Sequence, residues 1–161
     1  MNSTFAFKQN HLAVALTVIA FTAVAPLGHL AGQSTVTLPM KADGDISGLS
    51  VELTSVQKTG DSVMVRFKYI NSSDKHVLLR AQVGGQVDDL IYYVDAKNKK
   101  KYLVIRDTEK KPLASALHEL TLEAGETKGC WAKFPAPPAD TTAISVYIPG
   151  APPFENIPLA P

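Results

Sequence analysis

Two histidines, His76 and His118, supply the imidazole bases of residues 34–161. Nucleophilic catalysis needs such a base beside a serine or cysteine, with a third group to orient it. Neither histidine lies in a nucleophile elbow or in another recognisable local signature. We therefore expect that the chain is not an enzyme, and a secreted hydrolase is the most distant of the alternatives.

The residues that could hold a metal ion are widely scattered. Soft and borderline ions are bound by clustered His, Cys or Met side chains, and no zinc spacing is present. Asp88 and Asp89 follow Gly84 and Gly85 and could offer oxygen ligands to Ca²⁺, but an exposed acidic loop is the commoner arrangement. We therefore expect no metal and no cofactor. The scattered candidates are Met40, Met64, His76, His118 and Cys130.

Cys130 is the only cysteine, so it cannot close an internal disulfide. Free cysteine is among the most buried residue types, which predicts a small apolar side chain in the core. The alternative is a disulfide between two chains in an oxidising compartment. The sequence leaves both interpretations open.

Four lysines crowd one short polar segment, and they are Lys97, Lys99, Lys100 and Lys101. At the tip of a hairpin they would be solvated and would discourage pairing at the sheet edge. The functional alternative is a contact for an anionic surface, such as phospholipid head groups, lipopolysaccharide or an acidic partner. The four lysines are therefore candidate partner contacts.

Trp131 is the other candidate partner contact. Alternation along a strand places Cys130 and Phe134 on one face, and Trp131 with Lys133 on the other. If the first set faces the core, two environments remain for Trp131. It is either exposed, where Trp is a frequent interface anchor, or covered by the neighbouring Pro-rich segment 135–138.

Charged residues are nearly balanced, with 16 Lys and Arg against 15 Asp and Glu. Such a chain has no global field that would draw it to nucleic acid or to a membrane surface. We expect no nucleic acid partner and no small molecule. A membrane contact is expected only through an uncleaved signal anchor.

From Val36 onward, apolar residues recur with a period of two in short runs separated by turn residues. Residues 59–61, 95–101 and 124–126 are expected to join three hairpins. Arg106 to Glu119 is the one long connection, in which Ala114–Leu120 could form a single helical turn. The runs that we expect to be strands are 49–58, 63–69, 76–81, 90–94, 102–105, 120–123, 127–134, 144–148 and 154–159.

The sequence predicts about seven to nine short strands and no amphipathic helix to cover a sheet. Two sheets packed face to face best bury the apolar sides of such strands. The expected fold class is therefore all-β, an immunoglobulin-like antiparallel β-sandwich over residues 34–161. A barrel is the second choice. A domain of this size can bury a stable core without disulfides or a structural metal.

Residues 1–33 differ in composition from the rest of the chain. Leu12–Ala25 is uncharged and almost wholly apolar, and Lys8 is the only cationic side chain before it. The pattern predicts a signal peptide, or a signal anchor if Leu12–Ala31 spans the bilayer. Residues 30–33 resemble a lipobox, but Gln33 has no thiol for lipidation. We expect a periplasmic or secreted domain, preceded by an N-terminal signal helix.

Residues 130–140 read Cys-Trp-Ala-Lys-Phe-Pro-Ala-Pro-Pro-Ala-Asp, and residues 149–154 read Pro-Gly-Ala-Pro-Pro-Phe. With Tyr92-Tyr93-Val94-Asp95, they resemble an uncharacterised family of exported bacterial domains that is similar to telokin-like immunoglobulin sandwiches. The resemblance implies a fold and a compartment but no chemistry. Relatives often carry a Cys-x-Cys pair where this chain has Pro112-Leu113-Ala114-Ser115.

We therefore expect an exported, non-enzymatic binding module that contacts a protein or an envelope component through a sheet face or a loop end. The alternative from another class is a periplasmic carrier of a small molecule or metal ion. A carrier would need a concave pocket with convergent polar groups.

Overall fold

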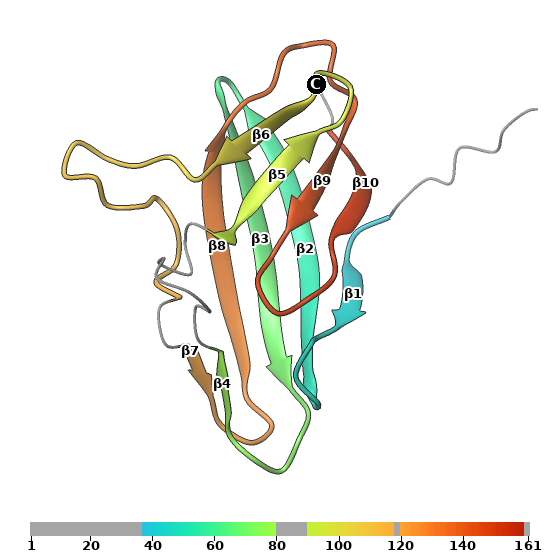
Figure 1. Ribbon diagram of the computed structural model, residues 1–161, viewed down its shortest axis with the longest axis vertical. Helices are drawn as coiled ribbons and strands as arrows, with labels where there is room; N and C mark the ends of the chain where they lie inside the picture. The colour runs from blue at the N-terminus through green and yellow to red at the C-terminus, as the bar shows by residue number, and fades with distance from the viewer. Residues whose placement is uncertain (1–36, 80–89, 118–119, 160–161) are drawn as a thin grey trace, which may run out of the picture. The chain divides into compact units, whose positions relative to one another are not determined.

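The computed structural model describes residues 37–79, 90–117 and 120–159, and its regular elements there are antiparallel strands (Figure 1). The expectation of an all-β chain is confirmed for these residues. Within them, no helix is long and apolar enough to cross a bilayer. The predicted signal segment, His118 and the acidic residues Asp88 and Asp89 lie outside the described ranges.

One four-stranded sheet holds the longest strands and is called the long sheet. Its order is β1-β2-β3-β8. β2 and β3 meet through Gly60, whose φ of 57° lies in the left-handed region that glycine adopts freely, so this predicted hairpin is confirmed. Its strands are β1 (Met40–Asp43), β2 (Leu49–Thr59), β3 (Ser62–Asn71) and β8 (Thr127–Pro135).

The other four-stranded sheet, called the short sheet, has the order β10-β9-β5-β6. β5 and β6 form the hairpin that the sequence predicts around residues 95–101. β6 begins at Lys100, however, so Lys100 and Lys101 lie in a strand rather than in the turn. The strands of the short sheet are β5 (Tyr92–Asp95), β6 (Lys100–Leu103), β9 (Ala143–Tyr147) and β10 (Phe154–Pro158).

The third predicted hairpin is wrong. β7 (Leu120–Leu122) pairs with β4 (Val77–Leu79), whereas β8 pairs with β3. The turn between β7 and β8 is present, because the Glu126 amide donates to the Glu123 carbonyl at 3.0 Å. β8 then crosses to β3 and gains nine paired residues, which the three residues of β7 could not offer.

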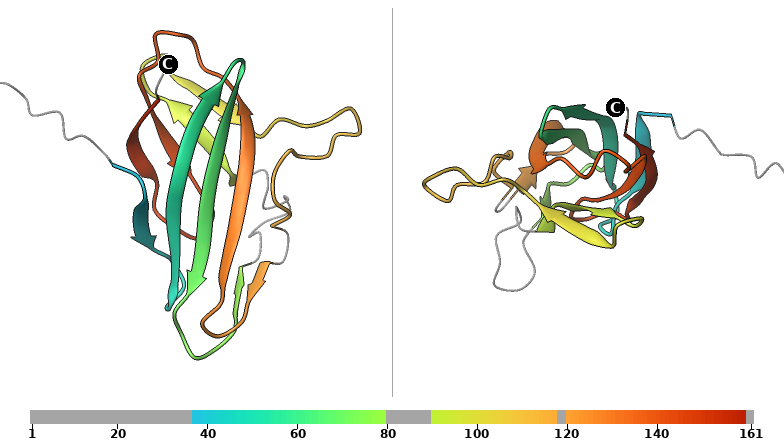
Figure 2. Two further views of the ribbon diagram at one scale, coloured as in Figure 1. Left: turned by 180° about the vertical axis from the view of Figure 1, so that it is seen from behind. Right: turned by 90° about the horizontal axis from the view of Figure 1, so that it is seen from above.

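Buried apolar residues of both four-stranded sheets belong to one core cluster. Figure 2 shows the backbone of these two sheets on opposite sides of the domain. Along β3, Val63, Val65, Phe67 and Tyr69 are buried and Arg66 is exposed, as the alternation predicts. From the short sheet, the Tyr93 ring meets the Phe134 ring edge to face at 5.5 Å. The Tyr93 hydroxyl donates to the Pro135 carbonyl at 2.7 Å, and burial raises the pKa of this phenol, so it stays a donor.

Two further features differ from the sequence prediction. In addition to the nine predicted strands, the described residues contain β1. The sequence did not predict it, because its four residues are half-buried or exposed and give too short a pattern. The helical turn expected from Ala114 is absent from the described residues 114–117. Ala114 instead forms a β-bridge with Ala132 on β8, because pairing with a strand edge satisfies the backbone of this long connection.

Candidate functional site

Trp131 lies on β8 and points to the outer side of the long sheet. Its side chain is 39% exposed, whereas Cys130, Ala132 and Phe134 are buried. The predicted alternation along this strand is therefore confirmed. Of the two environments expected for Trp131, the exposed one is observed.

Strand register surrounds Trp131 with residues that are distant in sequence. In the pairing of β3 with β8, Arg66 is opposite Trp131, Lys68 is opposite Gly129, and Met64 is opposite Lys133. Directly opposite residues have Cβ atoms about 5 Å apart on the same face of the sheet. We call these six residues the Trp131 face: Met64, Arg66, Lys68, Gly129, Trp131 and Lys133.

The Trp131 face is positively charged. Arg66 donates to the neutral amide oxygen of Gln57 at 3.1 Å, and Lys68 pairs with the Glu52 carboxylate at 3.2 Å. In the described part of the chain, neither Arg66 nor Lys133 has a carboxylate within ion-pair distance. Two cationic groups beside Trp131 are thus free to meet an external anion.

The long connection holds the backbone of Trp131 in place. The Ser115 amide donates to the Trp131 carbonyl at 2.8 Å, and the Trp131 amide donates to the Ser115 hydroxyl at 3.0 Å. The Lys133 amide donates to the Leu113 carbonyl at 2.9 Å. β8 is therefore bonded on both edges here, and the Trp131 face is built on rigid backbone.

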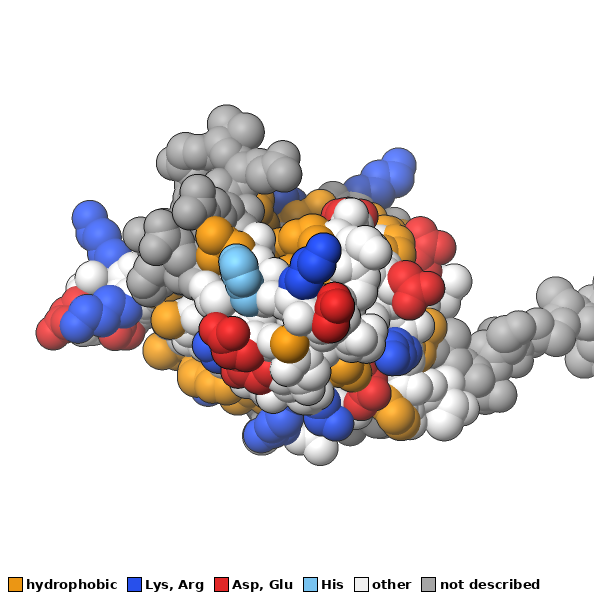
Figure 3. Space-filling view, turned by 90° about the horizontal axis from the view of Figure 1, so that it is seen from below, with side chains coloured by type: hydrophobic (Ala, Val, Ile, Leu, Met, Phe, Trp, Pro, Cys, Tyr) orange, Lys and Arg blue, Asp and Glu red, His pale blue; other side chains and the backbone are white. Residues whose placement is uncertain are grey.

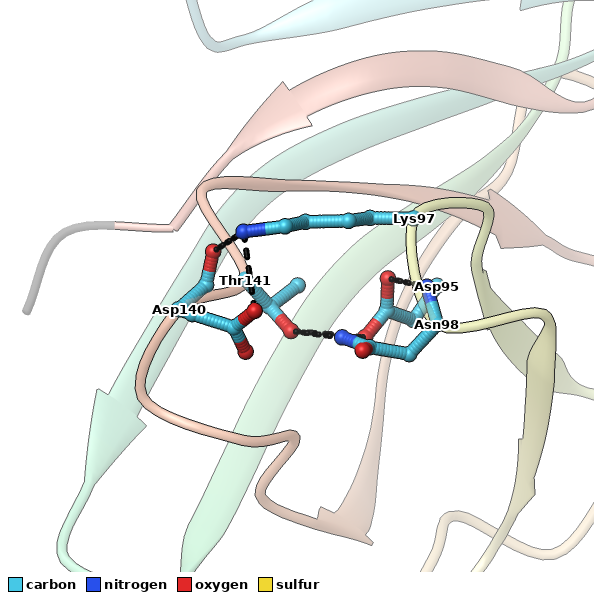
Figure 4. Close-up of polar contacts among 5 residues, drawn as sticks. All are labelled: Asp95, Lys97, Asn98, Asp140 and Thr141. Carbon is cyan, nitrogen blue, oxygen red and sulfur yellow. Dashed lines mark hydrogen bonds and ion pairs between the residues drawn. The ribbon is translucent and has the colours of Figure 1, made fainter.

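The four candidate lysines do not form one free cluster. Lys97 donates to the Asp140 carbonyl and pairs with the Asp140 carboxylate, both at 2.8 Å (Figure 4). The contact with the carboxylate lowers the pKa of Asp140. The Lys101 ammonium lies 3.6 Å from the centre of the Tyr92 ring. Only Lys99 and Lys100 among the four have no such contact within the described residues.

A buried carboxylate organises the turn that carries these lysines. Asp95 is fully buried and accepts a hydrogen bond from the Thr141 hydroxyl at 2.6 Å and from the Asn98 side-chain amide at 2.8 Å (Figure 4). Burial raises the pKa of Asp95, but these hydrogen bonds outweigh it and the pKa is lowered. Asp95 therefore ties the β5–β6 turn to the residues before β9, which is a structural role.

The outer side of the short sheet is apolar and aromatic. Tyr92 stacks on Tyr147 with ring centres 4.4 Å apart and planes at 14°. Leu103, opposite Tyr92 on β6, is 54% exposed, and Leu90 is 41% exposed. The sequence analysis did not single out these residues, although alternation in residues 90–94 could have placed Tyr92 outside once Tyr93 was taken as buried.

A surface hollow of about 380 Å³ lies where the β1–β2 and β3–β4 connections meet. Figure 3 shows acidic, basic and apolar side chains intermixed on that end of the domain. Ser73 lines the hollow, but its hydroxyl already has two acceptors for its single proton, the Asn71 side-chain oxygen at 2.7 Å and the Lys75 carbonyl at 3.0 Å. His76 is exposed there, and in the described residues no hydrogen bond joins it to a serine or a carboxylate. The hollow is lined by Ile46, Ser47 and residues 73–78.

Cys130 precedes Trp131 on β8 and is buried on the opposite, core-facing side of the strand, as one of its two interpretations predicts. Burial raises the pKa of the thiol, so it stays protonated and unreactive at neutral pH. Across residues 37–79, 90–117 and 120–159, no three His, Cys, Asp or Glu side chains gather as metal ligands do. Met40, Met64 and His76 lie on separate elements.

No family model, curated protein or solved structure matches the chain. The family resemblance of residues 130–140 and 149–154 therefore stays a prediction, and the argument for function rests on the residues themselves.

Proposed function

We propose that the chain is an exported, non-enzymatic binding module of the cell envelope or the extracellular space, and that its fold is an immunoglobulin-like sandwich. The pattern of residues 1–33 supports export. Two four-stranded antiparallel sheets with a shared core support the sandwich. The sequence context of His76 and His118 supports the non-enzymatic part of the proposal.

One observation carries the binding proposal: Trp131, 39% exposed, stands directly opposite Arg66 on a rigid strand pair. Trp and Arg are the residue types that most often anchor interfaces. Hydrogen bonds on both edges of β8 fix the backbone that carries the indole before any ligand arrives. A preformed contact loses less conformational entropy on binding, which favours affinity.

Co-purification from native envelope and medium fractions tests this function. We expect a component that the wild-type chain retains and that the double variant Trp131→Ala, Arg66→Gln releases. Leu103→Ala is the matched control, because it removes an exposed apolar side chain from the outer side of the other sheet. Equal retention by all three chains would remove the Trp131 face from the proposal, and hydrolysis of a retained component would end its non-enzymatic part.

A small-molecule or metal-ion carrier is the second candidate, and the 380 Å³ hollow is the observation that favours it. Small-molecule sites begin at about this volume, but they are mostly apolar with a few convergent polar groups. Native mass spectrometry of the exported protein separates the two candidates. A bound small molecule that Ser47→Trp displaces would establish the carrier, whereas the binding module retains none.

A further inference from the structure

We propose that the Trp131 face binds an acidic polysaccharide whose sugar rings carry carboxylate groups. The inference rests on the proposed function, because it assigns a ligand class to the same face. Four properties of the face lead to it: its charge, the open space beside the indole, an unsatisfied hydroxyl, and its small share of apolar side chains.

The charge of the face requires an anionic partner. On the outer side of the long sheet, Arg66, Lys68 and Lys133 stand near Trp131, and Glu52 is already engaged by Lys68. The guanidinium of Arg66 is planar and matches a carboxylate in a bidentate geometry. Because Arg66 now bonds only a neutral amide, exchanging that contact for a carboxylate gains a charge-assisted hydrogen bond.

The space beside Trp131 fits a flat ring. Gly129 lies two residues before Trp131 on the same face, and nothing stands within 4 Å of the place where its Cβ would be. A glycine inside a strand often marks the close approach of a ligand. The apolar face of a sugar ring packs against the indole, while carboxylates on its rim reach the flanking cations.

An unsatisfied hydroxyl lies at the same place. Ser55 on β2 is in register with Arg66, and its hydroxyl is buried without a hydrogen-bond partner among the described residues. Buried hydroxyls are nearly always paired. The many hydroxyl groups of a polysaccharide are polar partners of the kind that this serine lacks.

A protein partner suits the face less well. Interface cores are rich in aromatic and apolar groups and depleted in lysine. Near Trp131 the large apolar side chains are the half-buried Met64, on β3, and Leu113, which the antiparallel pairing of residues 113–115 with β8 places opposite Lys133. Lys68 and Lys133 complete the surroundings. The outer side of the short sheet, with Tyr92, Tyr147 and Leu103, is richer in aromatic and apolar groups, although Lys101 lies over the Tyr92 ring.

Fluorescence titration tests the proposal, because Trp131 is the only tryptophan of the chain. Polygalacturonate is the probe, and neutral dextran is the uncharged control. We expect a saturable change in Trp131 emission with polygalacturonate, none with dextran, and weaker binding as salt rises because the ions screen exposed charges.

Calorimetry with variants links the binding to the face. Arg66→Gln should weaken polygalacturonate binding by about tenfold, the loss that one charge-assisted hydrogen bond implies. Trp131→Ala should abolish measurable binding, and Lys99→Gln at the hairpin tip should change nothing. Circular dichroism first establishes that each variant is folded.

Three results would overturn the inference: no binding of polygalacturonate, binding that Arg66→Gln leaves unchanged, or tighter binding of poly-L-glutamate or of anionic phosphatidylglycerol vesicles. In the last case the Trp131 face recognises an acidic peptide or a membrane, and the binding module stands with a different ligand. If polygalacturonate fails while an envelope component is still retained through Trp131, only the ligand class is lost. Retention that is indifferent to Trp131 and Arg66 would remove the face altogether.

Discussion

The Trp131 face and the lysine-rich hairpin between β5 and β6 reach their charge by opposite routes. Residues 97–101 are basic neighbours in sequence, yet Lys97 is tied to Asp140 and Lys101 lies over Tyr92. Arg66 and Lys133 come from strands far apart in sequence, and the β3–β8 register places both beside Trp131. Two of the four hairpin lysines are engaged by internal contacts. On the Trp131 face, Lys68 is paired with Glu52, whereas Arg66 and Lys133 are brought together with no carboxylate partner among the described residues.

A binding surface in such a chain is therefore found from the spatial neighbours of its cations rather than from their density in the sequence. Tertiary contacts change what a cation offers to a partner, since the Asp140 carboxylate beside Lys97 offsets its charge and would repel a second anion. Four predictions break or sharpen this contrast, and they follow in order of expected effect.

Phe134→Ala should lower the free energy of unfolding by about 3–5 kcal/mol, because it leaves a cavity between the two sheets. Trp131→Ala, three residues away on the opposite face of β8, should cost clearly less than Phe134→Ala, because Trp131 is 39% exposed and its removal leaves no enclosed cavity. Urea denaturation measures both. If Trp131→Ala lowered the free energy of unfolding as much as Phe134→Ala, the indole would be part of the core packing, and the proposal that it binds a partner would lose its support.

Thr141→Val should lower the free energy of unfolding by about 1–3 kcal/mol, because it removes the 2.6 Å hydrogen bond to the buried Asp95 carboxylate. Thr142→Val is the matched control on an exposed neighbour and should stay within about 0.5 kcal/mol. Similar urea midpoints for the two variants would contradict the anchoring role of Asp95 in the hairpin.

Acid should weaken the same anchor. The pKa of Asp95 is lowered below its ordinary value of 3.8 on folding. Its stabilising contribution is therefore fully present above that pH and is lost as the pH falls through the folded pKa. Urea midpoints measured from pH 7 down to pH 2 should drop below about pH 4. The drop should be smaller in Thr141→Val, and an equal drop would assign the acid sensitivity to other carboxylates.

Lys133→Gln should weaken polygalacturonate binding by about threefold, because it removes one exposed charge beside Trp131. Lys97→Gln should leave binding unchanged, since this ammonium is engaged with Asp140. Calorimetry at low salt compares the two variants. If Lys97→Gln weakened binding more than Lys133→Gln, the anion would contact the hairpin rather than the Trp131 face, which contradicts the proposal.

Local patterns predicted much of the fold. Alternation in residues 63–69 placed Val65 and Phe67 inside and Arg66 outside, because side chains on a strand point to opposite faces in turn. The turn at Gly60 and the turn at residues 95–101 each joined the strands on either side. The third hairpin failed because a turn shows where a chain reverses but not which strand edge will be bonded.

The sequence by itself determined that the described domain is built of strands and that Trp131 faces away from Phe134. Tertiary structure alone decided that Arg66 stands opposite Trp131, that Ser115 bonds its backbone, and that Lys97 is not free. The physical reason is the sequence distance over which each property acts. Side-chain alternation is a property of neighbouring residues, whereas register and edge pairing depend on which distant strands bury their apolar faces together.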